Sequence, residues 1–241
     1  MDAPTRPHLF GLLAGLFLAA GLVFSAMVCT RAWMRIAEGQ SISVTGLARK
    51  NVRADLAIWR GTFSTEATTL LEAQQKLRQH LAIVEGFVRD KGLSNAVYSA
   101  IGIQELHVKA DEATRTTGYR LQQTVEIRSE NVSRMATLSG ETTTLVEQGV
   151  AFVPAAPEYL YTKAGEAKLE MLAEATKDAR GRAEQIAVQG GRQLGGLRSA
   201  KMGVFQITPL YSTETSWSGV NDTTSVDKTV AVTVAATFAM Q

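Results

Sequence analysis

The sequence predicts an α+β domain, built as a largely antiparallel sheet with three helices packed on it and preceded by one transmembrane helix. Residues Leu9 to Val28 form an apolar run without a charged residue, and about twenty helical residues span the roughly 30 Å hydrocarbon core of a membrane. After this run, segments of alternating apolar and polar residues take turns with segments of helical periodicity. Several strand-to-strand connections are too short for a crossover, which predicts antiparallel hairpins and the α+β class.

The length of the apolar run favours a retained membrane anchor over a cleaved signal peptide. Signal peptides carry an apolar stretch of about 7 to 15 residues and a small-x-small cleavage site. The best cleavage candidate, Phe24-Ser25-Ala26, has a bulky residue at its outer position. We therefore expect residues 1–38 to be an anchor or uncleaved signal segment and residues 39–241 to be the soluble domain, with cleavage as the alternative.

Charge limits the partners of the soluble part but does not fix the orientation of the anchor. Arg6 lies before the apolar run, and Arg31 and Arg35 lie after it, so the positive-inside rule is weak here. The chain has 25 basic and 23 acidic residues, and the soluble part is close to neutral, which predicts no nucleic-acid partner. Cys29 is the single cysteine of the sequence, so the soluble part has no disulfide, thiol nucleophile or cysteine metal site.

The first half of the soluble part predicts two strands and a helix. Ile42 to Thr45 alternates over a short strand that Gly46 ends, and the polar residues 49–51 predict a turn before a second strand over 55–65. We expect Asp55 to fix the turn between these strands. Thr69-x-x-Glu72 matches a capping box at the start of the following helix, and Gly92 suits the left-handed position that ends it.

Two more strands and a second helix follow in the same order. Residues 97–108 predict a strand with mixed faces, and residues 119–128 predict its partner, with one buried and one wet face. Asn131 is the expected cap of a helix that Gly149 ends. The threonines at 142–144 lower the helix propensity of this segment.

The second half predicts an edge strand, the longest helix and two further strands. Prolines in the segment 150–161 predict an edge strand or an interrupted strand, because proline cannot donate to a ladder. Helix 163–189 carries a stripe at four-residue spacing that predicts core packing, with a subunit interface as the alternative. The stripe consists of Ala167, Met171, Ala175, Ala179, Ala183 and Ala187. A strand over 197–208 and a polar loop over 209–225 precede the clearest alternation in the chain, at 226–240, where Lys228 breaks the buried face.

Few residues suggest catalytic, cofactor or metal chemistry. His8, His80 and His107 lack metal-ligand spacing with another histidine or with the cysteine. The run Gly190 to Gly196 follows a helix and precedes a strand, the reverse of what a phosphate-binding loop requires. We expect no catalytic, cofactor-binding or metal-binding residue and no cofactor, and therefore no enzyme. Asp55 and Glu66 are considered as a carboxylate pair, but a role in the turn suits Asp55 better.

The polar loop and the last strand together predict self-association. We expect the terminal strand to be exposed at a sheet edge. A strand as apolar as Val230 to Phe238 must cover its edges, and closed symmetric association is one way to do so. We expect a homo-oligomer larger than a dimer, with Tyr211 and Trp217 in the loop as candidate interface residues. The alternative is that a helix, or the proline-containing strand near Val153, covers the edge within one subunit.

Several short motifs, in this order, resemble the SIMPL domain family over about residues 41–240. They are Ile42-Ser43-Val44-Thr45-Gly46, Ala54-Asp55-Leu56-Ala57, Glu72-Ala73, Gly92, Gly118-Tyr119-Arg120, the alanine-rich helix from Ala175 to Ala187, Gly190 and Leu194-Gly195. The departures are Ala54, where the family usually has proline, a missing second glycine after Gly46, and a weak match around Ser94-Asn95. These departures affect turns and not the plan of the fold.

The resemblance implies a location and a class of function. Bacterial members typically reach the periplasm behind an N-terminal signal or anchor, some are similar to ring- or channel-like assemblies, and members are linked to envelope and oxidative stress. No activity or cofactor is established for the family. The resemblance thus implies a periplasmic soluble domain held at the inner membrane through residues 9–28, or released after signal cleavage. A monomeric module for a small ligand or partner, and an enzyme with a scattered active site, remain the alternatives.

Overall fold

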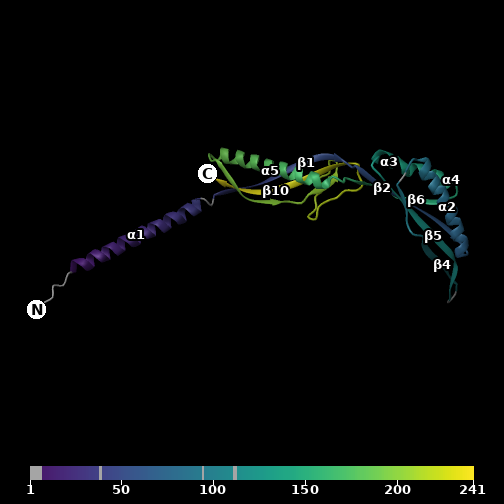
Figure 1. Cartoon of the computed structure of the whole chain (residues 1–241), viewed down its shortest axis with the longest axis horizontal. Coiled ribbons are helices and arrows are strands. Elements are labelled where there is room, and N and C mark those ends of the chain that lie inside the picture. Colours follow the sequence, from purple (N-terminus) through teal and green to yellow (C-terminus); the bar gives the residue numbers. More distant parts are fainter. Residues whose placement is uncertain (1–6, 38–39, 94, 111–112) are drawn as a thin grey trace. The chain divides into compact units, whose positions relative to one another are not determined.

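The computed structural model describes residues 7–37, 40–93, 95–110 and 113–241 (Figure 1). The helices are α1 (Pro7–Ala37), α2 (Leu70–Asp90), α3 (Val132–Glu141), α4 (Thr143–Glu147) and α5 (Ala164–Gln189). The strands are β1 (Ser41–Arg53), β2 (Leu56–Ala67), β3 (Ala96–Tyr98), β4 (Gly102–Ala110), β5 (Ala113–Ser129), β6 (Ala151–Pro154), β7 (Glu158–Leu160), β8 (Leu194–Met202), β9 (Gln206–Pro209) and β10 (Asp227–Met240). This arrangement confirms the predicted α+β class with antiparallel sheets.

Backbone contacts group the chain into two compact units. Unit 1 comprises Met1–Ala48, Leu172–Gly203 and Thr233–Gln241, and unit 2 comprises Arg49–Met171 and Val204–Val232. The strands β1 and β10 and the helix α5 each contribute residues to both units.

The helix α1 carries the predicted apolar run. Its stretch Gly11–Met34 is long and apolar enough to cross a membrane, and none of it is buried against the rest of the chain. An N-terminal helix of this kind fits a membrane span and a signal sequence equally well.

One sheet, which contributes residues to both units, has β10 as its middle strand. We call this sheet A, and its order is β1-β10-β8, with β9 also paired to β10. The prediction that the terminal strand is an exposed edge is therefore wrong, because β10 has a neighbour on each side. Neither a helix nor the strand near Val153 is what covers it.

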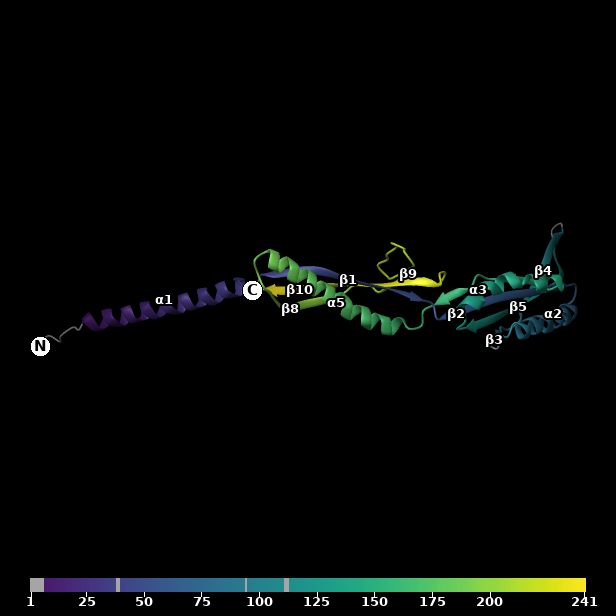
Figure 2. The same ribbon diagram turned by 90° about the horizontal axis from the view of Figure 1, so that it is seen from above.

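The helix α5 lies along sheet A (Figure 2). All six stripe residues are buried, which confirms the core-packing prediction. The approach is so close that a Cβ atom built on Gly46 of β1 would lie 2.1 Å from the carbonyl oxygen of Ala175 and 2.5 Å from the amide nitrogen of Ala179. Glycine at position 46 and alanine on the helix thus set the spacing between strand and helix.

Unit 2 contains a six-stranded sheet whose one face is covered by α2, α3 and α4 (Figure 1). Its order is β3-β5-β2-β6, with β4 paired to β5 and β7 paired to β2. The rings of Trp59 and Phe152 stack in the core with centroids 5.8 Å apart, and the Trp59 Nε1–H donates to Ser139 Oγ at 2.9 Å. The prolines of 150–161 lie in and between the short edge strands β6 and β7, as predicted.

Helix ends in unit 2 follow the sequence signals. Thr69 Oγ1 accepts from the Glu72 N–H at 3.3 Å, and Asn131 Oδ1 accepts from the Arg134 N–H at 3.1 Å. Gly92 and Gly149 adopt φ of +69° and +83°, the left-handed conformation that terminates a helix.

The helix that the sequence predicts between Asn131 and Gly149 is divided into two helices in the structure. The segment 131–149 forms α3 and α4, which meet at Thr142. Thr142, Thr143 and Thr144 each donate a hydroxyl hydrogen bond to the carbonyl oxygen three residues earlier. Such local bonds compete with the helical ladder, which explains why the run of threonines interrupts the helix.

Three strand predictions need correction. The first strand does not end at Gly46: β1 continues through residues 49–51 to Arg53, and β2 then begins a different sheet after two residues, so the two strands form no hairpin. The segment 97–108 is split into β3 and β4, and the segment 197–208 into β8 and β9. At the second break, the Gly203 N–H donates to Thr233 O, and a Cβ atom there would meet Thr233 Oγ1 at 2.2 Å.

Candidate interaction surface

Sheet A has two outer edges without a strand partner among the described residues, one on β1 and one on β8. The strands β8 and β10 are antiparallel. β1 also runs antiparallel to β10, because Gln40 O accepts from Met240 N, Ser43 Oγ bonds to Thr237 Oγ1, and Thr229 Oγ1 bonds to Asn51 Oδ1. The two open edges therefore run in the same direction, on opposite sides of one sheet.

The β8 edge is exposed on both faces of the sheet. Seven of its nine residues, from Gly196 to Met202, are exposed, and Leu197 and Met202 are apolar. The Gly203 N–H points inward to Thr233 O. Because N–H directions alternate along a strand, the N–H groups of Ala200 and Met202 point outward.

The β1 edge borders an apolar groove along α5. The Leu47 N–H points outward and donates to Asp178 Oδ2 of α5 at 2.8 Å, so the alternation turns the N–H groups of Ser43 and Thr45 outward as well. The groove has a volume of about 780 Å³. It is lined by Val44, Thr45, Asp178, Gly181, Arg182, Gln185 and Ile186.

Asp178, which lines the groove, connects α5 to β1. Its carboxylate accepts from the Leu47 N–H and from Arg182 Nε, both at 2.8 Å. The Leu47 hydrogen bond, with the Arg182 guanidinium, holds the pKa of the Asp178 carboxyl below its usual range. The ionised Asp178 carboxylate thus accepts from one outward N–H of β1, that of Leu47. It does not bond to the outward N–H groups of Ser43 and Thr45.

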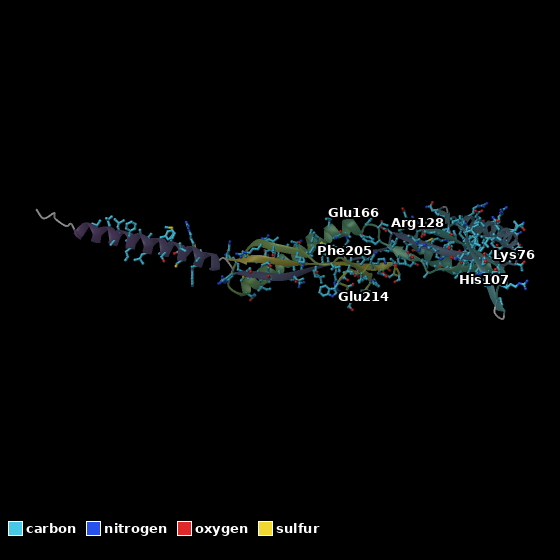
Figure 3. The ribbon with its side chains drawn as sticks, turned by 90° about the horizontal axis from the view of Figure 1, so that it is seen from below. Lys76, His107, Arg128, Glu166, Phe205 and Glu214 are labelled. Atoms are coloured by element: carbon cyan, nitrogen blue, oxygen red, sulfur yellow. The ribbon has the colours of Figure 1, made fainter. Side chains whose placement is uncertain are left out.

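The loop over 210–226 presents the two predicted contact residues to solvent. Tyr211 is 87% exposed and Trp217 is 99% exposed, and Glu214 marks this loop in Figure 3. Tyr211 has φ +64°, a left-handed conformation that is uncommon for residues other than glycine. Neither aromatic side chain is therefore packed against the rest of the subunit.

A buried ion pair fastens the end of this loop to β10. Lys228 is fully buried, and its Nζ donates to Asp222 Oδ2 at 2.8 Å and to Asp222 O at 2.6 Å. The Asp222 carboxylate also accepts from the backbone and hydroxyl groups of Thr224 and Ser225. Burial favours the neutral form of this carboxyl, but the hydrogen bonds from Lys228 and the hydroxyl residues outweigh it and hold the pKa of Asp222 well below its usual range. The residue that broke the predicted buried face therefore has a buried partner.

The carboxylates considered for acid–base chemistry have separate structural partners. Asp55 accepts from the Thr162 N–H at 2.8 Å and from Thr162 Oγ1 at 3.0 Å. It thus fixes the chain after β7, and not a β1–β2 turn. Glu66, at the other end of β2, pairs with Arg120. The structure does not bring the two carboxylates together on common partners.

The histidines also lie apart. His80 lies on α2, where burial lowers its pKa, and its buried Nδ1 has no hydrogen-bond partner among the described residues. His107 lies on β4 (Figure 3), 3.7 Å from Glu105. His8 lies in α1, and its side chain is outside the described part. Within the residues that the structure describes, no group of three or more His, Cys, Asp or Glu is arranged to hold a metal ion.

The glycine run after α5 is a helix stop, as predicted. Gly191 has φ +68°, and the Arg192 N–H donates to Ala187 O at 2.9 Å. β8 begins at Leu194 directly after this turn.

Sequence reasoning placed β8 but missed the open edges. One signal was present: from Gly195 to Met202 the apolar residues do not alternate with polar ones, which is typical of a strand with no buried face.

Comparison with known proteins agrees with the motifs. The family model described as "SIMPL: Protein of unknown function (DUF541)" matches residues 42–238. No curated protein matches the sequence.

Proposed function

Because the chain belongs to the SIMPL family, we propose that it is a membrane-anchored, non-enzymatic protein that works by assembling with copies of itself through the two open edges of sheet A. The observation that carries this proposal is the pair of edges itself. An unpaired strand edge is a template for another strand, and β8 offers one over nine residues.

The direction of the edges favours head-to-tail assembly. β1 and β8 run parallel within one subunit, so the β8 of one copy can lie beside the β1 of the next with all subunits turned by the same rotation. Such heterologous contacts form a closed ring when the rotation closes. The apolar groove beside β1 would receive side chains of the incoming strand, as in other cases of strand addition.

The location and the physiological role complete the proposal. α1 is retained as a single inner-membrane span, and the soluble domain faces the periplasm. The family resemblance supports this side of the membrane and a role in protection against envelope or oxidative stress. Signal cleavage, with release to the periplasm, is the alternative for α1.

The experiment measures the mass of the full chain in mild detergent by light scattering at tens of micromolar. We expect an oligomer larger than a dimer, and we expect Ala200→Pro to reduce its mass. Proline removes the outward N–H of the β8 edge without breaking a β8–β10 hydrogen bond. Ala200→Thr, which keeps the N–H, is the matched control and should assemble normally. A monomeric wild-type protein, or an oligomer that Ala200→Pro leaves intact, refutes assembly through this edge.

A second function is favoured by the groove. Its apolar lining beside outward N–H groups also suits an extended peptide bound as an added strand, which would make the protein a monomeric binding module. A monomeric mass, together with saturable binding of an apolar peptide that Gly181→Arg abolishes, would support this second function over the first.

A further inference from the structure

The end of sheet A nearest the anchor gathers three separate parts of the chain. Gln40 O accepts from the Met240 N–H at 3.0 Å, and Gln193 and Gln241 exchange backbone hydrogen bonds at 3.0 and 2.9 Å. Figure 1 shows the C-terminus at this end of β10, beside the start of β1 and the end of α5. We call the exposed side chains Val188, Arg192 and Leu197 at this end the tip.

Chain length keeps the tip close to the membrane end of α1. Three peptide units separate Ala37, the last residue of α1, from Gln40, and three units reach at most about 11 Å. The apolar stretch ends at Met34, so Gln40 lies within about 15 Å of the end of the span at 1.5 Å per helical residue. Lipid headgroups occupy roughly the first 5 to 8 Å outside the hydrocarbon core. Gln40 is therefore held within about 10 Å of the headgroup layer, and the tip lies at the same end of sheet A as Gln40.

The chemistry of the tip suits such a place. Val188 is 66% exposed and Leu197 is 51% exposed. Arg192 is exposed in the turn between them. Exposed apolar side chains next to a basic residue are typical of surfaces that rest in the interface of a membrane with anionic lipids.

The anchor ends with the same chemistry. Trp33 is exposed on α1, and Arg31 lies two residues before it. Tryptophan and arginine are the residues that settle at the headgroup level of a membrane-spanning helix. The tip thus continues an interface that the anchor already forms.

We propose that the tip is a second membrane contact, in which Val188 and Leu197 enter the headgroup layer and Arg192 binds anionic headgroups. This inference rests on the retained anchor of the proposed function, but not on assembly. Val188 and Leu197 lie outside the groove, but Leu197 belongs to the β8 edge. The tip contact is therefore tested with one chain per disc, where assembly cannot occur.

The experiment uses the full chain in nanodiscs, one chain per disc, in a Cys29→Ser background. Val188→Cys and Leu197→Cys are labelled with a fluorophore, and quenching by headgroup-level spin-labelled lipid is measured. Leu169→Cys, a 72% exposed position near the other end of α5, is the control. Phe17→Cys, which lies inside the apolar span of α1, reports insertion of the anchor through quenching by lipid that is spin-labelled in its acyl chain. The discs contain phosphatidylcholine alone or with about 30% phosphatidylglycerol.

We expect positions 188 and 197 to be quenched at least about twofold more than position 169 in the anionic discs, and Arg192→Glu to remove most of this difference. Quenching at 17 with equal, low quenching at 188, 197 and 169 overturns the tip contact and leaves the anchor standing. Absence of quenching at 17 overturns the anchor and the tip contact together. Strong quenching at 188 and 197 that is equal in both lipid mixtures overturns the recognition of anionic headgroups.

Discussion

Gly46→Ala should destabilise the protein by about 3 kcal/mol. The added Cβ would lie 2.1 Å from the carbonyl oxygen of Ala175, about 1.3 Å closer than ordinary van der Waals contact. Both nearest atoms belong to the backbone of α5, so no side chain can rotate away and the helix must lift from the strand. A radial gap of about 0.5 to 1 Å already forfeits a quarter to a half of each dispersion contact, and the buried stripe of α5 would lose contacts in this way.

The assay is urea unfolding of the full chain in mild detergent, followed by circular dichroism. For an m-value of about 2 to 3 kcal/mol/M, the midpoint should fall by about 1 M. Gly181→Ala on the same helix is the matched control, because a Cβ there meets no atom within 4 Å. Its removal of a helical glycine should stabilise the protein by up to about 1 kcal/mol. If the free energy of unfolding of Gly46→Ala lies within about 0.5 kcal/mol of the wild-type value, the close approach of α5 to β1 is refuted.

Three further outcomes follow from the loop and its buried ion pair. Lys228→Met should cost about 3 to 5 kcal/mol in urea unfolding, because it leaves the buried Asp222 carboxylate without its cation, and the double variant with Asp222→Asn should recover part of this loss; additive effects of the two changes would contradict the pairing. The pKa of Asp222 is lower in the folded protein than in the unfolded chain. The stability that this difference provides is complete above the unfolded pKa of about 4 and is lost as the pH falls toward the folded pKa. Asp222→Asn should therefore flatten the loss of unfolding free energy below about pH 4, and an unchanged acid profile would refute this. Trp217→Ala should change the unfolding free energy by less than about 0.5 kcal/mol, because the residue is 99% exposed; a lower oligomer mass in this variant would place the loop in the interface, and an unchanged mass would exclude Trp217 as the contact residue.

The parts of the fold that local chemistry dictates were predictable from the sequence. The alternation of β10, the small-residue stripe of α5 and the helix stops at Gly92 and Gly149 each depend on residues close together in the chain. The structure shows all of them where the pattern placed them.

The parts that depend on distant partners were not predictable. Residues 49–51 are polar and suggest a turn, yet Lys50 lies in β1 and pairs with Glu170 at 2.7 Å, a partner 120 residues away. Alternation tells which side chains of a strand are buried, but not which sheet the strand joins. For this reason β1 and β2 read as a hairpin although they belong to different sheets.

The candidate surface shows the same division. Tyr211 and Trp217 were recognisable as exposed aromatic residues because they lie in a polar loop. The edges of β1 and β8 were not, because an edge is defined by the strand that is missing beside it. Lys228 stood out as an exception on a buried face, but only the structure identifies Asp222 as its partner.

The position of β10 in sheet A also determines when the sheet can form. Ser43 and Thr237 touch across β1 and β10 although 194 residues separate them, and β8 has no neighbour on its inner side until β10 arrives. A chain emerging from its N-terminus therefore carries an incomplete sheet A until β10 is available. Contacts of such long sequence separation form slowly, and the unpaired strands are prone to wrong pairing while they wait. Under the proposed periplasmic location the domain would cross the membrane unfolded, and this delay would keep sheet A open during its passage.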